Sequence, residues 1–236
     1  GDIFMRFFRS LFNGFTPIEV CLWLGSLALI VGSAFFFGSA DYLYVVAALI
    51  GATSLIFVSK GNVLGQILTV VFSVFYGVIS FSFRYYGEMI TYLGMTAPIA
   101  VASVVTWLKN PYKDKKNEVT VNRLSAREYA LILALGVAVT VAFYFILRAL
   151  DTANLVVSTV SVLTSFVAVW LTMRRSALYA LAYAMNDVVL IVLWTFAALE
   201  SVEYVSMVVC FVVFFANDLY GFFNWRRLRK RQQAGK

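Results

Sequence analysis

Long apolar runs separated by short polar segments dominate the chain, and such a run recurs eight times. A run of about 20 apolar residues suits a membrane-spanning α-helix, because about 30 Å of hydrocarbon is crossed at 1.5 Å per residue. The runs are continuous rather than alternating, which favours helices over the strands of a membrane barrel. The pattern therefore predicts an all-α integral membrane protein. The predicted spans are 19–37, 42–59, 64–83, 87–108, 128–147, 153–173, 177–199 and 202–225.

Composition excludes a soluble domain. Of the 236 residues, 62% are hydrophobic and 13% are charged, and the mean hydropathy is +0.86. Soluble domains are about 45–50% apolar, and a soluble surface built from this chain would expose large apolar patches. The chain has no His, so a His-based metal site or proton relay is excluded. Cys21 and Cys210 lie in apolar runs, which is typical of packing residues. We expect neither a metal nor a cofactor.

The basic residues predict the orientation in the membrane. When the loops are assigned alternately to the two sides, 17 of the 19 Lys and Arg residues fall on the side that holds both termini. The other side receives Arg84 and Arg148. Because basic loops stay in the cytoplasm, both termini are predicted to be cytoplasmic. The basic tail at 226–231 directly follows a span, which favours contact with anionic lipid over nucleic acid.

An internal repeat divides the chain. A Thr-Ser pair recurs in the second and sixth spans, and when 98–107 is aligned with 216–225, Trp107 falls on Trp225. Three helices and one linking helix reverse the direction four times, so the two triplets form a parallel repeat. Such repeats are typical of transporters that bind substrate at the repeat interface. The predicted units are an N-terminal segment with an extra helix (1–41) and a first triplet (42–108). A loop with a linking helix (109–151) and a second triplet with a basic tail (152–236) follow.

Polar side chains inside the spans are the candidate substrate-binding residues. Asp187 and Asp218 lie within apolar spans, and each follows an Asn, at Asn186 and Asn217. An ionisable group inside a span is costly, which favours a functional role. The other candidates are polar and aromatic residues of the third, fourth, seventh and eighth spans: Gln66, Tyr76, Tyr92, Tyr183, Trp194, Tyr220 and Asn224.

This chemistry favours transport of a small solute. Carboxylates and amides beside aromatic rings suit a solute with hydroxyl groups and a flat ring, and they would also suit a positive charge. The spans carry no basic residue at the midplane that an anionic substrate would need. A facilitator and a proton-coupled carrier, with Asp187 or Asp218 as the relay, both remain open. An intramembrane enzyme is disfavoured because no nucleophile motif is present, and a purely structural subunit would leave the buried acids unexplained.

Three motifs carry a resemblance to a known family: RYYGEM at 84–89, AYAMND at 182–187 and ANDLYGFFNW at 216–225. With these motifs, the chain resembles the nicotinamide riboside transporter family of the PnuC type. The resemblance implies a three-plus-one-plus-three core similar to SWEET transporters, with an extra N-terminal helix. It also implies passive uptake of nicotinamide riboside, trapping by an intracellular kinase, and a homotrimer in the bacterial inner membrane.

Two departures bear on the substrate. Where many members of the family have tryptophans three and six residues before the Asn of the seventh span, this chain has Tyr183 and Ala180. Where many members have Pro-Met-Gln in the fourth span, this chain has Pro98, Ile99 and Ala100. Thiamine and riboflavin therefore remain alternative substrates.

Overall fold

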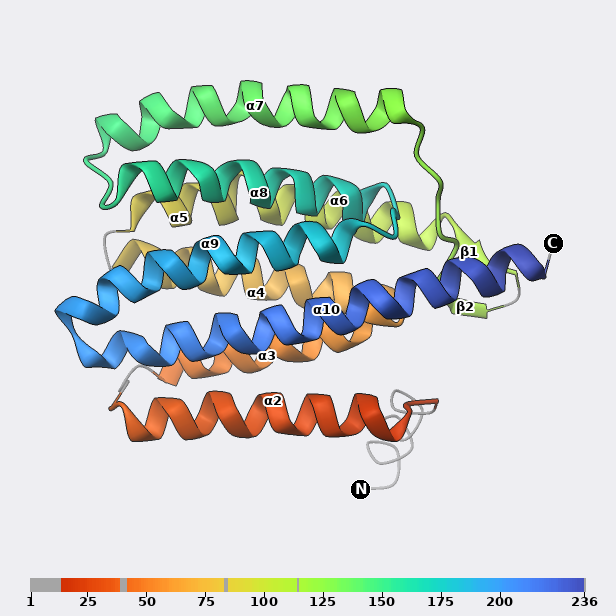
Figure 1. Cartoon of the computed structure of the whole chain (residues 1–236), viewed down its shortest axis with the longest axis horizontal. Helices are drawn as coiled ribbons and strands as arrows, with labels where there is room; N and C mark the ends of the chain where they lie inside the picture. The colour runs from red at the N-terminus through yellow and green to blue at the C-terminus, as the bar shows by residue number, and fades with distance from the viewer. Residues whose placement is uncertain (1–13, 39–41, 83–84, 114, 236) are drawn as a thin grey trace.

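The structure, a computed structural model, describes residues 14–38, 42–82, 85–113 and 115–235. Within these ranges, eight helical segments are long and apolar enough to cross a membrane, which confirms the predicted fold class. They run side by side as one bundle (Figure 1). The helices are α2 (Pro17–Phe36), α3 (Tyr42–Ser59), α4 (Val63–Ser82), α5 (Tyr86–Ile90), α6 (Ala97–Leu108), α7 (Ala126–Ala149), α8 (Leu155–Met173), α9 (Tyr179–Glu200) and α10 (Val205–Ala234). A 3₁₀ turn, Val202–Tyr204, precedes α10.

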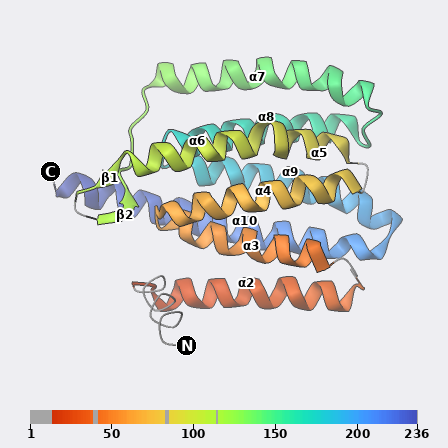
Figure 2. The same cartoon turned by 180° about the vertical axis from the view of Figure 1, so that it is seen from behind.

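The two triplets form two layers that face each other. In Figure 1, α8, α9 and α10 lie in front, and in Figure 2, seen from behind, α5–α6, α4 and α3 lie in front. At the edges of the layers, α3 packs against α10 and α6 packs against α8. Each outer helix of one triplet thus contacts an outer helix of the other, as a parallel repeat about a pseudo-two-fold axis requires.

A reciprocal pair of tryptophans confirms the repeat at the level of side chains. The Nε1 of Trp107 donates to the carbonyl of Thr172 on α8 at 3.0 Å, and the Nε1 of Trp225 donates to the carbonyl of Val58 on α3 at 2.8 Å. Each bond therefore joins the last helix of one triplet to the first helix of the other. The two indole rings also meet, with centroids 5.5 Å apart.

The helices α2 and α7 lie outside this core, at opposite edges of the bundle (Figure 1). They are the least buried of the eight spans in the described chain, and α7 packs mainly on α8. A capping box begins each of them, because Thr16 and Ser125 each pair with a Glu three residues later. Such a box satisfies free N–H groups at the start of a helix.

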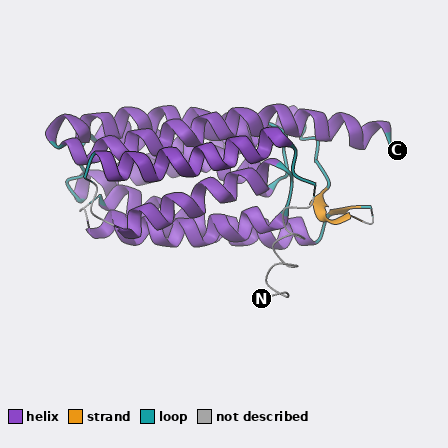
Figure 3. Ribbon diagram, turned by 90° about the horizontal axis from the view of Figure 1, so that it is seen from below, coloured by secondary structure: helices purple, strands orange, loops and turns teal. Residues whose placement is uncertain are grey.

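The polar stretch between α6 and α7 forms a β-hairpin, β1 (Pro111–Tyr112) and β2 (Lys115–Val119), which the sequence pattern did not predict. It projects from the end of the bundle that carries the C-terminal end of α10 (Figure 3). From the last residue of β2 onward, the chain bonds to the turns that follow α3 and α8. The N–H of Val119 donates to the carbonyl of Gly61, and the N–H of Asn122 donates to that of Arg175, each at 2.9 Å.

The fourth span is not one continuous α-helix. A π-helical turn, Thr91–Thr96, separates α5 from α6, and the N–H of Ala97 bonds to the carbonyl of Tyr92 five residues back. Pro98 explains the break, because it has no N–H to continue the α-helical ladder. Single π-turns are frequent at functional sites, and this one faces the centre of the bundle.

Candidate substrate site

A cavity of about 60 Å³ lies between the two triplets. Residues from α3, α4, the π-turn, α9 and α10 line it, so both halves of the repeat contribute. A drug-sized ligand needs roughly 300 Å³ or more, so a solute with a ring and a sugar would have to move the lining side chains or helices apart. The predicted residues that line the cavity are Gln66, Tyr92, Tyr183, Asn186, Asp187 and Asp218.

Asn186 is held in the cavity wall by α8. Its Oδ1 accepts hydrogen bonds from Thr164 Oγ1 at 2.7 Å and from Ser165 Oγ at 2.9 Å. In the first triplet, Ser54 Oγ and Thr69 Oγ1 lie 2.7 Å apart at the corresponding contact between α3 and α4. The Ser of the Thr-Ser pair recognised in the sequence therefore joins the first two helices in each triplet, whereas Thr53 accepts from Trp23 Nε1 of α2. Because the oxygen of Asn186 already accepts two bonds, its NH₂ is the group left to donate to a solute.

The two aspartates meet in the cavity. Asp187 and Asp218 are each 3% exposed, and their carboxyl groups interact with each other. In the described chain, Oδ2 of Asp187 is buried and has no hydrogen-bond partner. A buried acceptor without a partner costs about 1–3 kcal/mol. A solute that donates a hydroxyl proton, or brings a positive charge, would remove this cost and reduce the repulsion between the acids.

Aromatic rings form the rest of the wall. Phe72 stacks on Tyr76 at 5.5 Å and meets Tyr92 and Phe214 edge-on at 6.0 and 5.7 Å. Gly51 makes room for this cluster, because a Cβ there would lie 2.5 Å from the ring of Phe214. Sequence reasoning had not selected Phe72 for the site, since Phe is frequent throughout the apolar spans. A flat ring could stack here, and a cation would be attracted to the ring faces.

Five predicted residues lie outside the cavity, where they join helices. Trp194 Nε1 donates to the hydroxyl of Tyr76 at 3.2 Å, which links α9 to α4 behind the cavity wall. Asn217 Nδ2 donates to Ser26 Oγ at 2.9 Å, which links α10 to α2. Their contacts are those of packing residues between helices.

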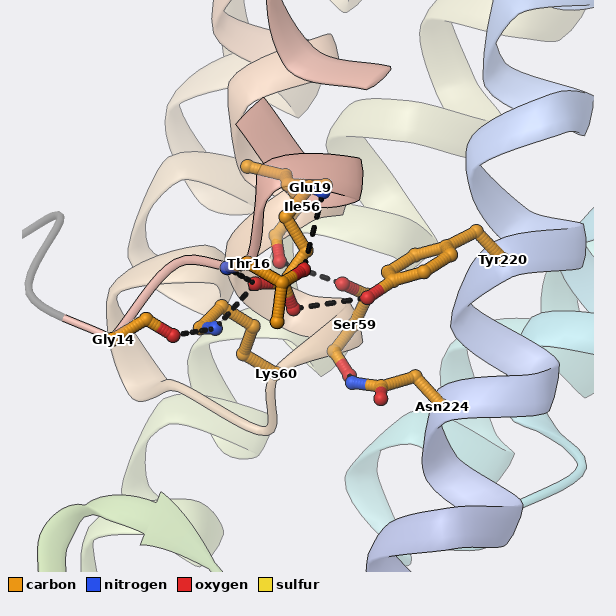
Figure 4. Close-up of polar contacts among 8 residues, drawn as sticks. All are labelled: Gly14, Thr16, Glu19, Ile56, Ser59, Lys60, Tyr220 and Asn224. Atoms are coloured by element: carbon orange, nitrogen blue, oxygen red, sulfur yellow. Dashed lines mark hydrogen bonds and ion pairs between the residues drawn. The ribbon is translucent and has the colours of Figure 1, made fainter. Parts of the chain in front are cut away.

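Tyr220 and Asn224 belong to a polar cluster at the end of the bundle where α2 begins (Figure 4). The hydroxyl of Tyr220 donates to Glu19 Oε1 at 3.0 Å, and Asn224 Nδ2 donates to the carbonyl of Ser59 at 2.9 Å. Glu19 also pairs with Lys60 at 2.7 Å. The cluster ties the extra helix to α3 and α10, so these residues hold the core together rather than line the cavity.

Two buried acids were not among the candidate residues selected from the sequence. Glu19 and Glu88 are 2% and 3% exposed, and Ser161 Oγ of α8 donates to Glu88 Oε1 at 3.3 Å. Both acids sit at the start of an apolar run, where an acidic residue is usually solvated. Within the described residues, no group of three or more His, Cys, Asp or Glu side chains could hold a metal ion.

The comparison with known proteins now identifies the family. Residues 41–227 match the family described as nicotinamide mononucleotide transporter. The chain belongs to this family. A relative from Neisseria mucosa, named nicotinamide riboside transporter PnuC, is 29% identical over 231 residues, which cover 96% of this chain and 87% of the relative. A protein of the same name from Haemophilus influenzae is 21% identical over 227 residues and covers 96% and 97%.

A solved structure agrees with this family. The crystal structure of the vitamin B3 transporter PnuC has a TM-score of 0.83 to this chain at 27% identity, covering 96% of this chain and 97% of that one. Family and neighbours are transporters, so the chain is a multi-pass membrane transporter and not an enzyme. The resemblance to this family that the three motifs indicated is confirmed.

Proposed function

We propose that this transporter carries nicotinamide riboside through the central cavity. The observation that carries the proposal is the pairing of Asp187 and Asp218 beside aromatic rings, in a cavity with no Lys or Arg among its described lining residues. The riboside has a flat pyridinium ring with a fixed positive charge and a ribose with hydroxyl groups. The ring would stack on the aromatic wall, the acids would balance its charge, and Asn186 and Gln66 would bond to the ribose or the amide.

The charge of the cavity favours the riboside over the mononucleotide. The mononucleotide adds a phosphate that carries up to two negative charges near neutral pH. Beside two carboxyl groups, and with no guanidinium or ammonium group among the described lining residues, a phosphate would be repelled. The names of the curated relatives, which specify the riboside, support the same choice.

Transport in this proposal is passive. The riboside enters down its gradient, the inside-negative potential adds about 2.3 kcal/mol per 100 mV if one charge crosses, and an intracellular kinase traps the product by phosphorylation. The protein sits in a bacterial inner membrane with both termini in the cytoplasm, which the partition of 17 to 2 basic residues supports. A SWEET-like rocking of the two triplets and assembly as a homotrimer stay predictions.

The experiment measures uptake of external ligand into proteoliposomes without an imposed pH gradient. Radiolabelled nicotinamide riboside is expected to equilibrate, and an excess of unlabelled riboside to compete. Nicotinamide mononucleotide, thiamine and riboflavin should compete at least about tenfold less well, because each alters the charge or the shape that the cavity recognises. Accumulation above equilibrium when a pH gradient is imposed would favour the proton-coupled carrier. Equal competition by thiamine or riboflavin would overturn the choice of substrate.

A further inference from the structure

A second and larger cavity shares no described lining residue with the central one. It has a volume of about 570 Å³, and it is bounded by the loop around the β-hairpin, the turn after α8 and the last turns of α10. This volume falls within the range of roughly 300–1,000 Å³ that is typical of small-molecule sites. The described lining residues are Asn110, Tyr112, Thr120, Val121, Asn122, Arg123, Arg175, Arg229, Gln232 and Gln233.

The charge of this cavity is opposite to that of the central one. Three arginines, Arg123, Arg175 and Arg229, line it, and none of its described lining residues is acidic. Glu118, the nearby acid of β2, is bound by Gln232 and by Arg231 and does not line the cavity. A guanidinium group offers donors in a planar fork that matches the oxygens of a phosphate.

Arg175 has an uncommon backbone conformation and a half-buried guanidinium side chain. Its backbone has a φ of +59°, in the left-handed region that only a few per cent of non-glycine residues adopt. Its side chain is half-buried, and in the described chain Nε is buried without a hydrogen-bond partner. Burial and the adjacent Arg174 lower the pKa of Arg175 from its usual value. Nη1 of the same side chain donates to the carbonyl of Thr120 at 3.4 Å. A bound anion would offset the cost of desolvating this guanidinium group.

The other lining groups suit the remainder of a nucleotide. Tyr112 offers the one aromatic ring among the described lining residues, and four amide side chains also line the cavity. Gln232 already bonds to Val121, Glu118 and Val119, and Nδ2 of Asn110 donates to the carbonyl of Thr106, so Asn122 and Gln233 are the amides proposed to meet the ligand. Amides can donate to and accept from a base and a ribose, and an aromatic ring can stack on a base. Gln233 lies about two turns beyond Trp225 on α10, roughly 12 Å along the helix axis, so the cavity sits on the aqueous side of the span.

We propose that this cavity is a binding site for a phosphorylated nucleotide, with its phosphate held by Arg123, Arg175 and Arg229. These three arginines come from the linking loop, the turn after α8 and α10, so a bound phosphate bridges three segments of the fold. The site does not depend on which solute the central cavity carries.

The test is isothermal titration of the purified full-length protein in neutral detergent with AMP, inorganic phosphate and adenosine. AMP is expected to bind, and adenosine to bind at least about tenfold more weakly, because the phosphate supplies the charge-assisted bonds. Arg229→Gln and Arg123→Gln should each weaken AMP binding by about tenfold or more. Lys230→Gln is the matched control, because Lys230 carries the same charge on α10 but does not line the cavity.

Three results would overturn the proposal. They are the absence of AMP binding, equal affinities for AMP and adenosine, and equal losses in Arg229→Gln and Lys230→Gln. A lipid headgroup carries the same phosphate chemistry, so short-chain phosphatidylglycerol is titrated in parallel. Stabilisation by that lipid, lost in Arg229→Gln and unaccompanied by AMP binding, would assign the cavity to a headgroup instead. Melting curves without ligand should superimpose for wild type and variants, which keeps a folding defect apart from a binding defect.

Discussion

Replacing one acid of the central cavity tests whether the carboxyl groups serve as counter-ions. Asp187→Asn and Asp218→Asn each keep the size of the side chain and remove one carboxyl group from a pair whose members are each 3% exposed. A positive ring about 5 Å from a carboxylate, at an effective dielectric constant of about 20, gains about 3 kcal/mol. The remaining acid compensates for part of this loss. We therefore expect nicotinamide riboside to bind about 10- to 100-fold more weakly to either variant.

The assay compares two ligands of the same shape. Benzamide riboside has an uncharged ring in place of the pyridinium, so it should lose no more than about threefold, the equivalent of a weak hydrogen bond. Calorimetric titration of both ligands into wild type and variants measures the difference. Asp151→Asn is the matched control, because Asp151 is an exposed acid in the loop between α7 and α8. Equal losses for the charged and uncharged ligands would refute the counter-ion role.

The remaining predictions concern the cavity wall, the extra helix and the orientation. Asn186→Ala should weaken riboside binding by about 1–3 kcal/mol, whereas Asn217→Ala should lower the melting temperature and leave binding intact. Calorimetric titration measures the binding and melting curves measure the stability. A loss of binding in both variants would contradict the assignment of Asn217 to helix packing. Glu19→Ala should lower the melting temperature because it removes the carboxylate that pairs with Lys60. Adding Lys60→Met should recover part of the lost melting temperature. An unchanged melting temperature for Glu19→Ala would show that the pair does not stabilise the fold. A cysteine at position 236, with the native cysteines replaced, should react with an impermeant reagent only in permeabilised cells, and labelling of intact cells would reverse the topology.

The arrangement of spans could be predicted because length and hydropathy decide it. An apolar run of about 20 residues has few other stable conformations, so the eight spans follow directly from the sequence. The repeat also had a physical signature, since Trp107 and Trp225 are both needed to donate across the layers. Pro98 marks a break in the fourth span but not its form, because the extra residue of a π-turn leaves the hydropathy of the span unchanged.

The site could be predicted only in part, because adjacent residues on a helix point about 100° apart. The rotation of α9 brings the side chains of both Asn186 and Asp187 to the cavity wall. On α10 only Asp218 lines the cavity, and Asn217 turns toward α2. Which of these two geometries holds depends on how each helix is rotated against its neighbours. Tertiary packing sets that rotation, and a single-helix pattern does not contain it.

The segment 119–122 bonds to the turns after α3 and α8 and so sets the spacing between the two triplets at this end of the bundle. The bonds from Val119 to Gly61 and from Asn122 to Arg175 fix the distance between the ends of α3 and α8, and only two residues separate the donors. Three residue steps span at most about 10–11 Å. A deletion there would draw the two triplets together, and an insertion would release one of them. An insertion in the hairpin turn would leave both bonds in place. Natural variation in the length of this loop should therefore be concentrated in the hairpin turn.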